Sequence, residues 1–291
     1  MSTISSSLHG LQLTLTLNRN QSVFNNALTS LSSGSKNSSV ADDPVGAGLS
    51  GELTSQQQRL NAASTNIQNA VSFAQTGDAI LSNVGSVLNR MSELVSLAQD
   101  PTQSSTDIAN YQTEFQGLQN DLRNTIGGTT AEIGGASGVA SPLGAFDGIS
   151  LFGANPSGYQ VVLGASPEDS MTIPATNLQT GAMLSLIQQD SSGNFTLNVS
   201  STSATDVAGA IQQVAIGRAT LGGAQARLDL ASSSVQTQNQ SIGSALSQIN
   251  DVDVAAASTR LATANVLVQT DAAMAAQANT NAESVLKLLK Q

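Results

Sequence analysis

The fold is decided by a heptad repeat in residues 53–95, which read LTSQQQRLNAASTNIQNAVSFAQTGDAILSNVGSVLNRMSELV. Positions seven apart are aliphatic throughout, and the positions three residues further on are mostly small. This spacing places one narrow apolar stripe along a long helix, as the seam of a coiled coil requires. The aliphatic series is Leu53, Leu60, Ile67, Ala74, Leu81, Leu88 and Val95.

A proline ends this first helix, and a second helix follows it. Pro101 forces Asp100 out of helical geometry. Beyond it, apolar residues recur in steps of three and four, which predicts a helix over about residues 105–126. These apolar residues are Ile108, Tyr111, Phe115, Leu118 and Leu122.

The heptad repeat returns near the other end of the chain. One series runs from residue 207 to 249, and after a change of register another continues to residue 289. Some 85 residues are therefore mostly helix, whereas the usual helix has about 11–12 residues. We predict that the seam residues also serve assembly between chains. The two series are Val207, Val214, Leu221, Leu228, Val235, Ile242 and Ile249, then Val254, Leu261, Val268, Ala275, Ala282 and Leu289.

The middle of the chain differs from both ends in composition and in its hydrophobic pattern. Residues 127–153 contain eight glycines, and short runs of β-forming residues lie between Gly, Pro, Asn and Asp. We expect strands at Ile149–Phe152, Tyr159–Leu163, Met171–Ile173 and Phe195–Val199, paired as hairpins. The predicted fold is mostly α, with long coiled-coil-like helices from both chain ends packed together and a small β-hairpin-containing middle region.

The first 40 residues fit two structures equally well. Leucines at every second position from 11 to 17 alternate as in a strand. Other apolar residues fall on one face of a helix. Residues 32–48, rich in Ser, Gly and Asn, are typical of a connector. The helical face would be Ile4, Leu8, Leu11, Leu15, Leu28 and Leu31.

Composition excludes several classes of protein. Only 10% of the 291 residues are charged, against a usual share of about 25%. Cysteine is absent, which excludes a disulfide framework, thiolate catalysis and cysteine-ligated metal sites. No run approaches the roughly 20 apolar residues of a membrane span. The first basic residue is Arg19, so we expect export, if it occurs, without a cleaved leader.

The net charge of −10 argues against a nucleic-acid-binding surface. The charge is also unevenly distributed. Residues 42–253 hold 18 acids against five arginines, whereas both ends are slightly basic. The ends and the middle are therefore expected to form different kinds of surface.

No motif predicts catalysis, a cofactor or a metal. Residues Gly46–Gly51 match G-x-G-x-x-G, but no strand precedes them and no βαβ unit surrounds them, so we expect a packing turn and not a nucleotide site. Asp42 and Asp43 precede a helix and are better placed to cap it than to bind a metal. His9 is the only histidine, which leaves no histidine-based triad or zinc site. We therefore predict that the protein is not an enzyme.

Several stretches at both ends of the chain resemble the bacterial flagellins. Together they cover roughly residues 1–125 and 205–291. The matching stretches are Leu31–Asp43 (LSSGSKNSSVADD), Asn89–Leu94 (NRMSEL), the hairpin Phe146–Phe152 (FDGISLF), and the C-terminal Ile249–Asp253, Val266–Gln269, Ala276–Asn279 and Val285–Leu289.

The resemblance implies a subunit that polymerises into the flagellar filament for swimming motility, with both chain ends helical and paired in the core of a hollow tube. It divides the chain into an N-terminal inner-tube helix and connector (1–45), outer-tube helices (46–126), a Gly-rich and β-hairpin region (127–204), an outer-tube helix (205–250) and a C-terminal inner-tube helix (251–291). Only a small insert fits around residues 127–204, where the family often carries large outer domains.

The resemblance also implies partners and a location. The partners are other copies of the chain, an export chaperone at the C-terminal segment, and the filament cap and hook-junction proteins. The location is the extracellular filament. Arg90, Leu94 and Glu114 match the residues by which an animal Toll-like receptor recognises some flagellins, although Ser92 replaces a second arginine of that motif. Lateral packing between subunits is the alternative role for these three residues.

Two rival functions remain. One is the junction protein between hook and filament, a relative with similar terminal helices. The other is a cytosolic helical signalling rod, which would form a stable dimer and not a long polymer.

Overall fold

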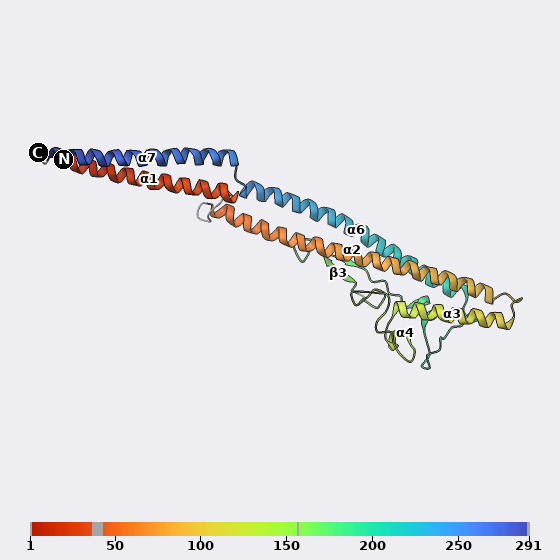
Figure 1. Ribbon diagram of the computed structural model, residues 1–291. Helices are drawn as coiled ribbons and strands as arrows, with labels where there is room; N and C mark the ends of the chain where they lie inside the picture. Colours follow the sequence, from red (N-terminus) through yellow and green to blue (C-terminus); the bar gives the residue numbers. More distant parts are fainter. Residues whose placement is uncertain (1, 37–42, 156, 290–291) are drawn as a thin grey trace. The chain divides into compact units, whose positions relative to one another are not determined.

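A computed structural model describes residues 2–36, 43–155 and 157–289. Within these ranges the chain is dominated by long helices from both ends, with two small hairpins in the middle (Figure 1). The elements in chain order are α1 (Ser2–Ser33), α2 (Pro44–Ala98), α3 (Ser105–Ile126), α4 (Thr130–Ile133), β1 (Ala145–Phe146), β2 (Ile149–Ser150), β3 (Tyr159–Val162), β4 (Ser170–Ile173), α5 (Gly181–Ile187), α6 (Ala204–Asn250) and α7 (Val254–Leu289).

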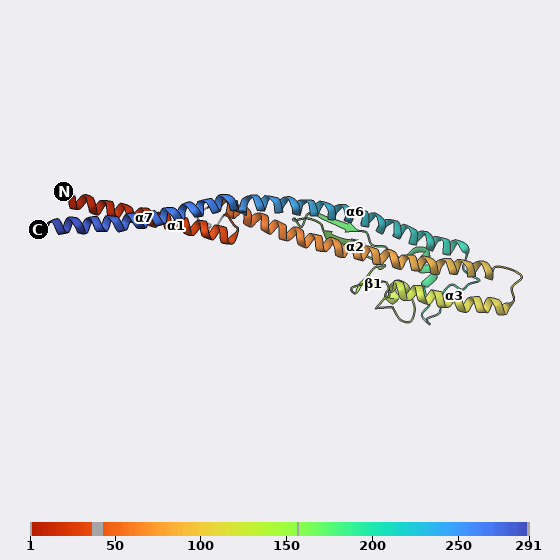
Figure 2. The same ribbon diagram turned by 45° about the horizontal axis from the view of Figure 1, so that its top comes forward.

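The two chain ends form one compact unit, residues 1–57 and 240–291. In this unit α1 lies beside α7 in both views (Figures 1 and 2), and the helices run antiparallel. At one point Asn20 Nδ2 donates to Asp271 Oδ2 at 2.6 Å. Beyond the end of α1, the backbone N–H of Lys36 donates to the carbonyl of Asn250, also at 2.6 Å. The helical structure implied for the N-terminus is confirmed, and the strand alternative is wrong.

The face that α1 turns toward α7 differs from the one expected. Its half-buried residues follow alternate steps of three and four, whereas Leu11 is 63% exposed, Leu15 61% and Leu28 48%. Three residues of the expected helical face are therefore exposed, because α1 carries apolar residues on two faces. The side chains of Ile4 and Leu8 lie outside the described residues. The half-buried series is Gly10, Leu13, Leu17, Asn20, Phe24, Ala27 and Leu31, and Ser30 beside it is half-buried too.

The connector before α2 is shorter than predicted, because α2 begins at Pro44. Proline suits the first turn of a helix, where its missing N–H would have no helical partner. The carboxylate of Asp43 accepts a hydrogen bond from the N–H of Gly46 at 2.8 Å, which confirms its capping role. Asp42 lies outside the described residues.

The second compact unit, residues 58–239, is built on the pairing of α2 with α6. Both views show these helices side by side (Figures 1 and 2). Arg218 on α6 pairs with Asp78 on α2, with Nε and Oδ1 2.8 Å apart. Asn239 Nδ2 donates to Asn61 Oδ1 at 2.7 Å. The predicted heptads thus pack against each other within one chain.

A glycine on α6 allows that helix to approach both α2 and the loop before α5 closely. A Cβ added at Gly217 would lie 2.5 Å from Thr176 Cγ2 and 3.3 Å from Leu81 Cδ1, whereas one added at Gly223 would meet nothing within 4 Å. Alanine in an exposed helix interior is usually about 1 kcal/mol more favourable than glycine. Overpacking a filled interior costs about 1–3 kcal/mol.

We therefore expect opposite effects from the same substitution at two sites on α6. Gly217→Ala should lower the free energy of unfolding by about 1–2 kcal/mol, whereas Gly223→Ala should raise it by about 0.5–1 kcal/mol. Urea titration followed by circular dichroism measures both changes. Equal effects at the two positions would contradict the close packing at Gly217.

The helix α3 has the predicted bounds, and its ends explain them. Ser104 and Asp107 form a capping box, in which the Ser104 hydroxyl accepts from the Asp107 N–H and the Asp107 carboxylate accepts from the Ser104 N–H. Gly127 follows the last turn with φ 68°, a conformation that favours glycine and ends the helix.

The middle region contains two antiparallel hairpins. β1 pairs with β2 across a turn at Asp147 and Gly148, both with positive φ. β3 pairs with β4, with Tyr159 opposite Ile173. The short helices α4 and α5 were not predicted.

The strand expected at Phe195–Val199 is absent from the part of the chain that the structure describes. Phe195 forms a single bridge to Gln189. The reason lies at Asn198, whose side-chain oxygen accepts from the backbone N–H groups of Ser200 and Ser201 at 3.0 and 2.8 Å. Such local bonds offer the backbone an alternative to a sheet.

Candidate functional site

The predicted seam residues are packed most tightly in the second unit. Ten of them there are at most 4% exposed, so they contact other parts of the same chain. Ile242 is 8% exposed, whereas Leu53, Ile249, Leu261 and Val268 are half-buried. The side chain of Leu289 lies outside the described residues. The ten are Leu60, Ile67, Leu81, Leu88, Val95, Val207, Val214, Leu221, Leu228 and Val235.

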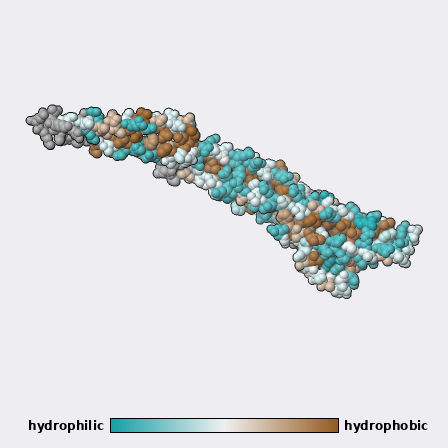
Figure 3. Space-filling model, in the orientation of Figure 1, coloured by the Kyte–Doolittle hydropathy of each residue, from teal (hydrophilic) through white to brown (hydrophobic). Residues whose placement is uncertain are grey.

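The helix pair α1–α7 instead leaves large apolar side chains in contact with solvent. Figure 3 shows hydrophobic residues gathered on its surface. Eight of them are between 43% and 63% exposed, four on each helix. Contiguous exposed apolar surface marks a site of protein–protein interaction. The eight are Leu11, Leu15, Val23 and Leu28 on α1, and Val254, Val266, Leu267 and Met274 on α7.

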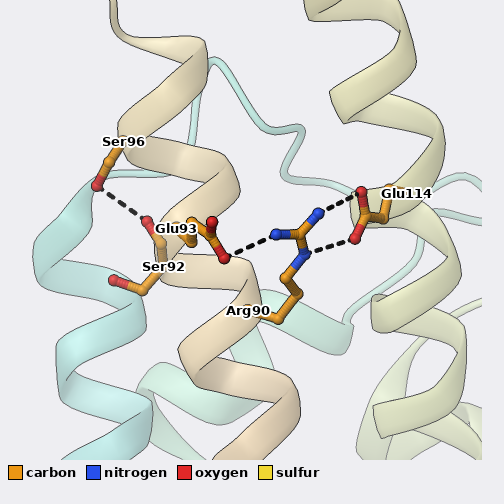
Figure 4. Close-up of polar contacts among 5 residues, drawn as sticks. All are labelled: Arg90, Ser92, Glu93, Ser96 and Glu114. Carbon is orange, nitrogen blue, oxygen red and sulfur yellow. Dashed lines mark hydrogen bonds and ion pairs between the residues drawn. The ribbon is translucent and has the colours of Figure 1, made fainter.

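A cluster of charges joins α2 to α3 on the surface of the second unit (Figure 4). The Arg90 guanidinium donates from Nε to Glu114 Oε1 at 2.6 Å and from Nη2 to Oε2 at 2.9 Å. Its Nη1 donates to Glu93 Oε2 at 2.7 Å. The structure thus brings Arg90 and Glu114 together as a two-bond ion pair.

Leu94 lies apart from this exposed cluster, because its side chain is fully buried. Ser92 is half-buried, and its carbonyl accepts from the Ser96 hydroxyl at 3.0 Å (Figure 4). Of the three predicted receptor or packing residues, Arg90 and Glu114 are therefore accessible to a partner, whereas Leu94 contributes to the core.

The ion pair has a measurable consequence. The hydrogen bond from Arg90 holds the pKa of Glu114 below its ordinary value of 4.5. A lowered pKa in the folded chain means that the pair stabilises at neutral pH and that this contribution is lost as pH falls through the lowered pKa.

We expect Arg90→Ala to raise the pKa of Glu114 toward 4.5. Carbon-detected NMR titration of the Glu114 carboxyl in both chains measures the difference. Arg218→Ala, which removes the guanidinium that pairs with Asp78, is the matched control and should leave Glu114 unchanged. The same titration midpoint with and without Arg90 would contradict the pairing.

Three buried polar residues that the sequence did not single out hold the middle region to α3. Gln119 Nε2 donates to the carbonyls of Leu186 and Leu197, and Gln179 Nε2 donates to that of Gly127. Arg123, 3% exposed, is the third. For Gln119 and Arg123 the sequence signal is a polar residue at a buried position of a helix with heptad-like spacing, and that signal does not reveal the partners. Gln179 lies outside the helices and has no such signal.

The Arg123 guanidinium lies among backbone carbonyls. Nη1 donates to Ile133 at 2.7 Å and Ile187 at 3.1 Å, and Nη2 donates to Gly134 at 2.7 Å and Ser137 at 3.0 Å. Burial lowers its pKa, although an arginine stays protonated in proteins. One side chain on α3 therefore binds the C-terminal ends of α4 and α5 and the loop that follows α4.

The described residues contain no group of three or more His, Asp or Glu placed to hold a metal ion. No helix within the described ranges is both long and apolar enough to cross a membrane.

Comparison with known proteins gives consistent results along the whole chain. The family model of the bacterial flagellin N-terminal helical region matches residues 4–132, and that of the C-terminal helical region matches residues 204–289. The flagellar filament 33 kDa core protein of Treponema phagedenis is 30% identical, covering 94% of each chain. The flagellin of Bacillus subtilis is 29% identical, covering 97% of this chain and 99% of the relative. That of Halalkalibacterium halodurans is 28% identical over 91% of each.

Proposed function

The chain belongs to the bacterial flagellins, structural subunits of the extracellular flagellar filament, and we propose how its two units share that role. The α1–α7 pair makes the inner contacts of the tube, and the α2–α6 pair stiffens the surrounding layer. The supporting observation is the contrast in burial. Most apolar residues along the paired faces of α2 and α6 are buried within one chain, and these helices expose four large apolar side chains, Val45, Leu49, Ile216 and Leu230, whereas α1 and α7 expose eight and bury few.

Within this proposal the tube layers follow the five segments set out above. Residues 1–45 and 251–291 supply the inner helices, and residues 46–126 and 205–250 supply the outer ones. Residues 127–204 form the small outer insert. Because the repeated contact does not close on itself, it generates an open helical assembly and not a ring. Motility then comes from rotation of a rigid filament, and we infer no catalytic step by the subunit.

Seeded polymerisation tests this function directly. Purified full-length chain is mixed with fragments of its own filament and examined by electron microscopy. Long filaments growing from the fragments are expected. A stable dimer that never elongates would favour the signalling rod, and binding to hook ends without elongation would favour the junction protein.

We further propose export without a cleaved leader, with a chaperone bound to the α7 segment until the chain reaches the cap and hook-junction proteins at the growing end. Exposed apolar residues on α7, such as Val266 and Met274, support a chaperone contact before assembly. The mass of the filament subunit, measured by mass spectrometry, should equal that of the full chain, with at most the initiator methionine removed. Loss of a longer N-terminal segment would contradict this route.

Recognition by an animal Toll-like receptor stays a proposal for Arg90 and Glu114, which are exposed. The burial of Leu94 supports the alternative, in which these residues serve packing. Receptor activation by Arg90→Ala and Glu114→Ala chains distinguishes the two roles, because unchanged activation would contradict the receptor contact.

A further inference from the structure

Each terminal helix carries apolar residues on more than one face, so hydrophobicity alone does not fix how α1 and α7 pair. On α1, Leu13 and Leu17 are half-buried, whereas Leu11 and Leu15 are exposed. On α7, Leu261 and Val268 are half-buried, and Val266, Leu267 and Met274 are exposed.

Among the described residues, a side-chain hydrogen bond joins the paired faces. Among the described side chains, the half-buried residues of α1 include two polar ones, Asn20 and Ser30, of which Asn20 lies near the middle of the helix, and the buried and half-buried residues of α7 include one charged residue, Asp271. Asn20 and Asp271 meet, with Asn20 Nδ2 2.6 Å from Asp271 Oδ2. Asp271 is only 5% exposed, and among the described residues it forms no ion pair. The inner series of α7 is Ala257, Leu261, Ala264, Val268, Asp271, Ala275 and Ala278.

We propose that the Asn20–Asp271 pair determines which faces of α1 and α7 turn inward, and thereby keeps the other apolar faces free for neighbouring copies. The inference rests on the proposed function, in which those outer faces make the filament contacts. A single buried polar position that specifies pairing at some cost in stability is well attested in coiled coils.

Within the described residues, the pairing is also fixed at the connector end. There Ser35 and Asp251 form a backbone bridge, and the Val252 N–H donates to the carbonyl of Gly34 at 3.1 Å. From that end onward the inner series of α7 is mostly alanine. Such small side chains do little to favour one face of α7 over another in the packing against α1. The Asn20–Asp271 bond lies farther along both helices and supplies the second fixed point.

Rotation of α1 or α7 about its own axis breaks the Asn20–Asp271 hydrogen bond. The free-energy cost of this loss is larger in the filament than in the soluble chain. A hydrogen bond to a charged group is stronger than one between neutral groups. If α7 turned outward, the Asp271 carboxylate would enter the surface that other copies cover, and a buried charge without a partner is strongly unfavourable. The native faces are therefore selected both within the chain and in the filament.

Engineered cysteines can report which faces meet, because the chain has none of its own. Ala27→Cys with Ala264→Cys places one thiol on each inner face, and Asn18→Cys with Ala273→Cys places one on each outer face. Disulfides formed within a chain are separated by mass from those between chains. The readout is a ratio, the yield of intrachain disulfide from the inner-face cysteine pair divided by the yield from the outer-face pair. It is measured whether or not a variant has entered filaments.

Asp271→Ala should lower this ratio about tenfold or more, the amount expected for loss of a hydrogen bond to a charged group. Asp271→Asn, which retains an acceptor oxygen, should preserve most of it. An unchanged ratio in Asp271→Ala would overturn the proposal, as would equal losses in the Ala and Asn variants. A wild-type chain that fails to form filaments would instead count against the proposed function, so the two failures are distinguishable.

Discussion

Replacing Arg123 with Met should lower the free energy of unfolding of residues 58–239 by about 2–4 kcal/mol. Met keeps much of the apolar volume but removes donors from the carbonyls of Ile133, Ile187, Gly134 and Ser137. Each buried polar group left unpaired costs about 1–3 kcal/mol. Relief from burying a charge offsets part of that loss.

Tyrosine fluorescence during urea unfolding reports on this unit, because both tyrosines, Tyr111 and Tyr159, lie within it and the chain has no tryptophan. Arg123→Lys is the control. It keeps the charge but has fewer donors and no planar fork, so its loss should be intermediate. A Met variant as stable as wild type would show that the loops hold their places without the guanidinium.

Replacing Leu15 with Asp should raise the critical concentration for filament growth by about ten- to a hundredfold, because burying a leucine side chain contributes about 1.5–3 kcal/mol. Leu15 is 61% exposed on α1, so its replacement should change the stability of the soluble chain very little. Its helix content, measured by circular dichroism, should stay unchanged.

The control for Leu15→Asp is Gln12→Asp, which adds the same charge to an exposed polar position of the same helix. It should change the critical concentration much less. Equal effects of the two substitutions would mean that charge, and not the apolar face of α1, governs growth. Light scattering and sedimentation of polymer measure both.

The long helices were predictable because their heptads repeat many times and end at strong signals. A series of seven aliphatic residues predicts a helix even where one position fits the pattern poorly. Pro101 and the Ser104 capping box are signals for helix ends that can be read from the sequence. The start of α2 at Pro44 was harder to predict, because proline is typical both of a connector and of the first turn of a helix. Phe195–Val199 has strand composition, yet the turn at Asn198 is decided by local side-chain bonds.

The assembly surface was predictable only in part. A sequence shows that α1 is apolar at several positions, but which face α7 covers depends on where Asn20 meets Asp271, 251 residues apart. The same limit applies to Arg123, whose carbonyl partners lie 10 to 64 residues away along the chain. Leu94 matches a residue of the receptor motif in sequence, but its position on α2 buries its side chain in the core of the chain.

We propose that neighbouring copies complete the α1–α7 pair. Isolated helices that bury little are marginal in water, and segments of this kind order when they bind. Hydrogen–deuterium exchange of residues 10–31 and 260–280, compared between soluble chain and filament, tests the claim most directly. We expect fast exchange in the soluble chain, where α1 and α7 pair through the same faces but open often, and strong protection in the filament. Strong protection already present in the soluble chain would contradict the proposal.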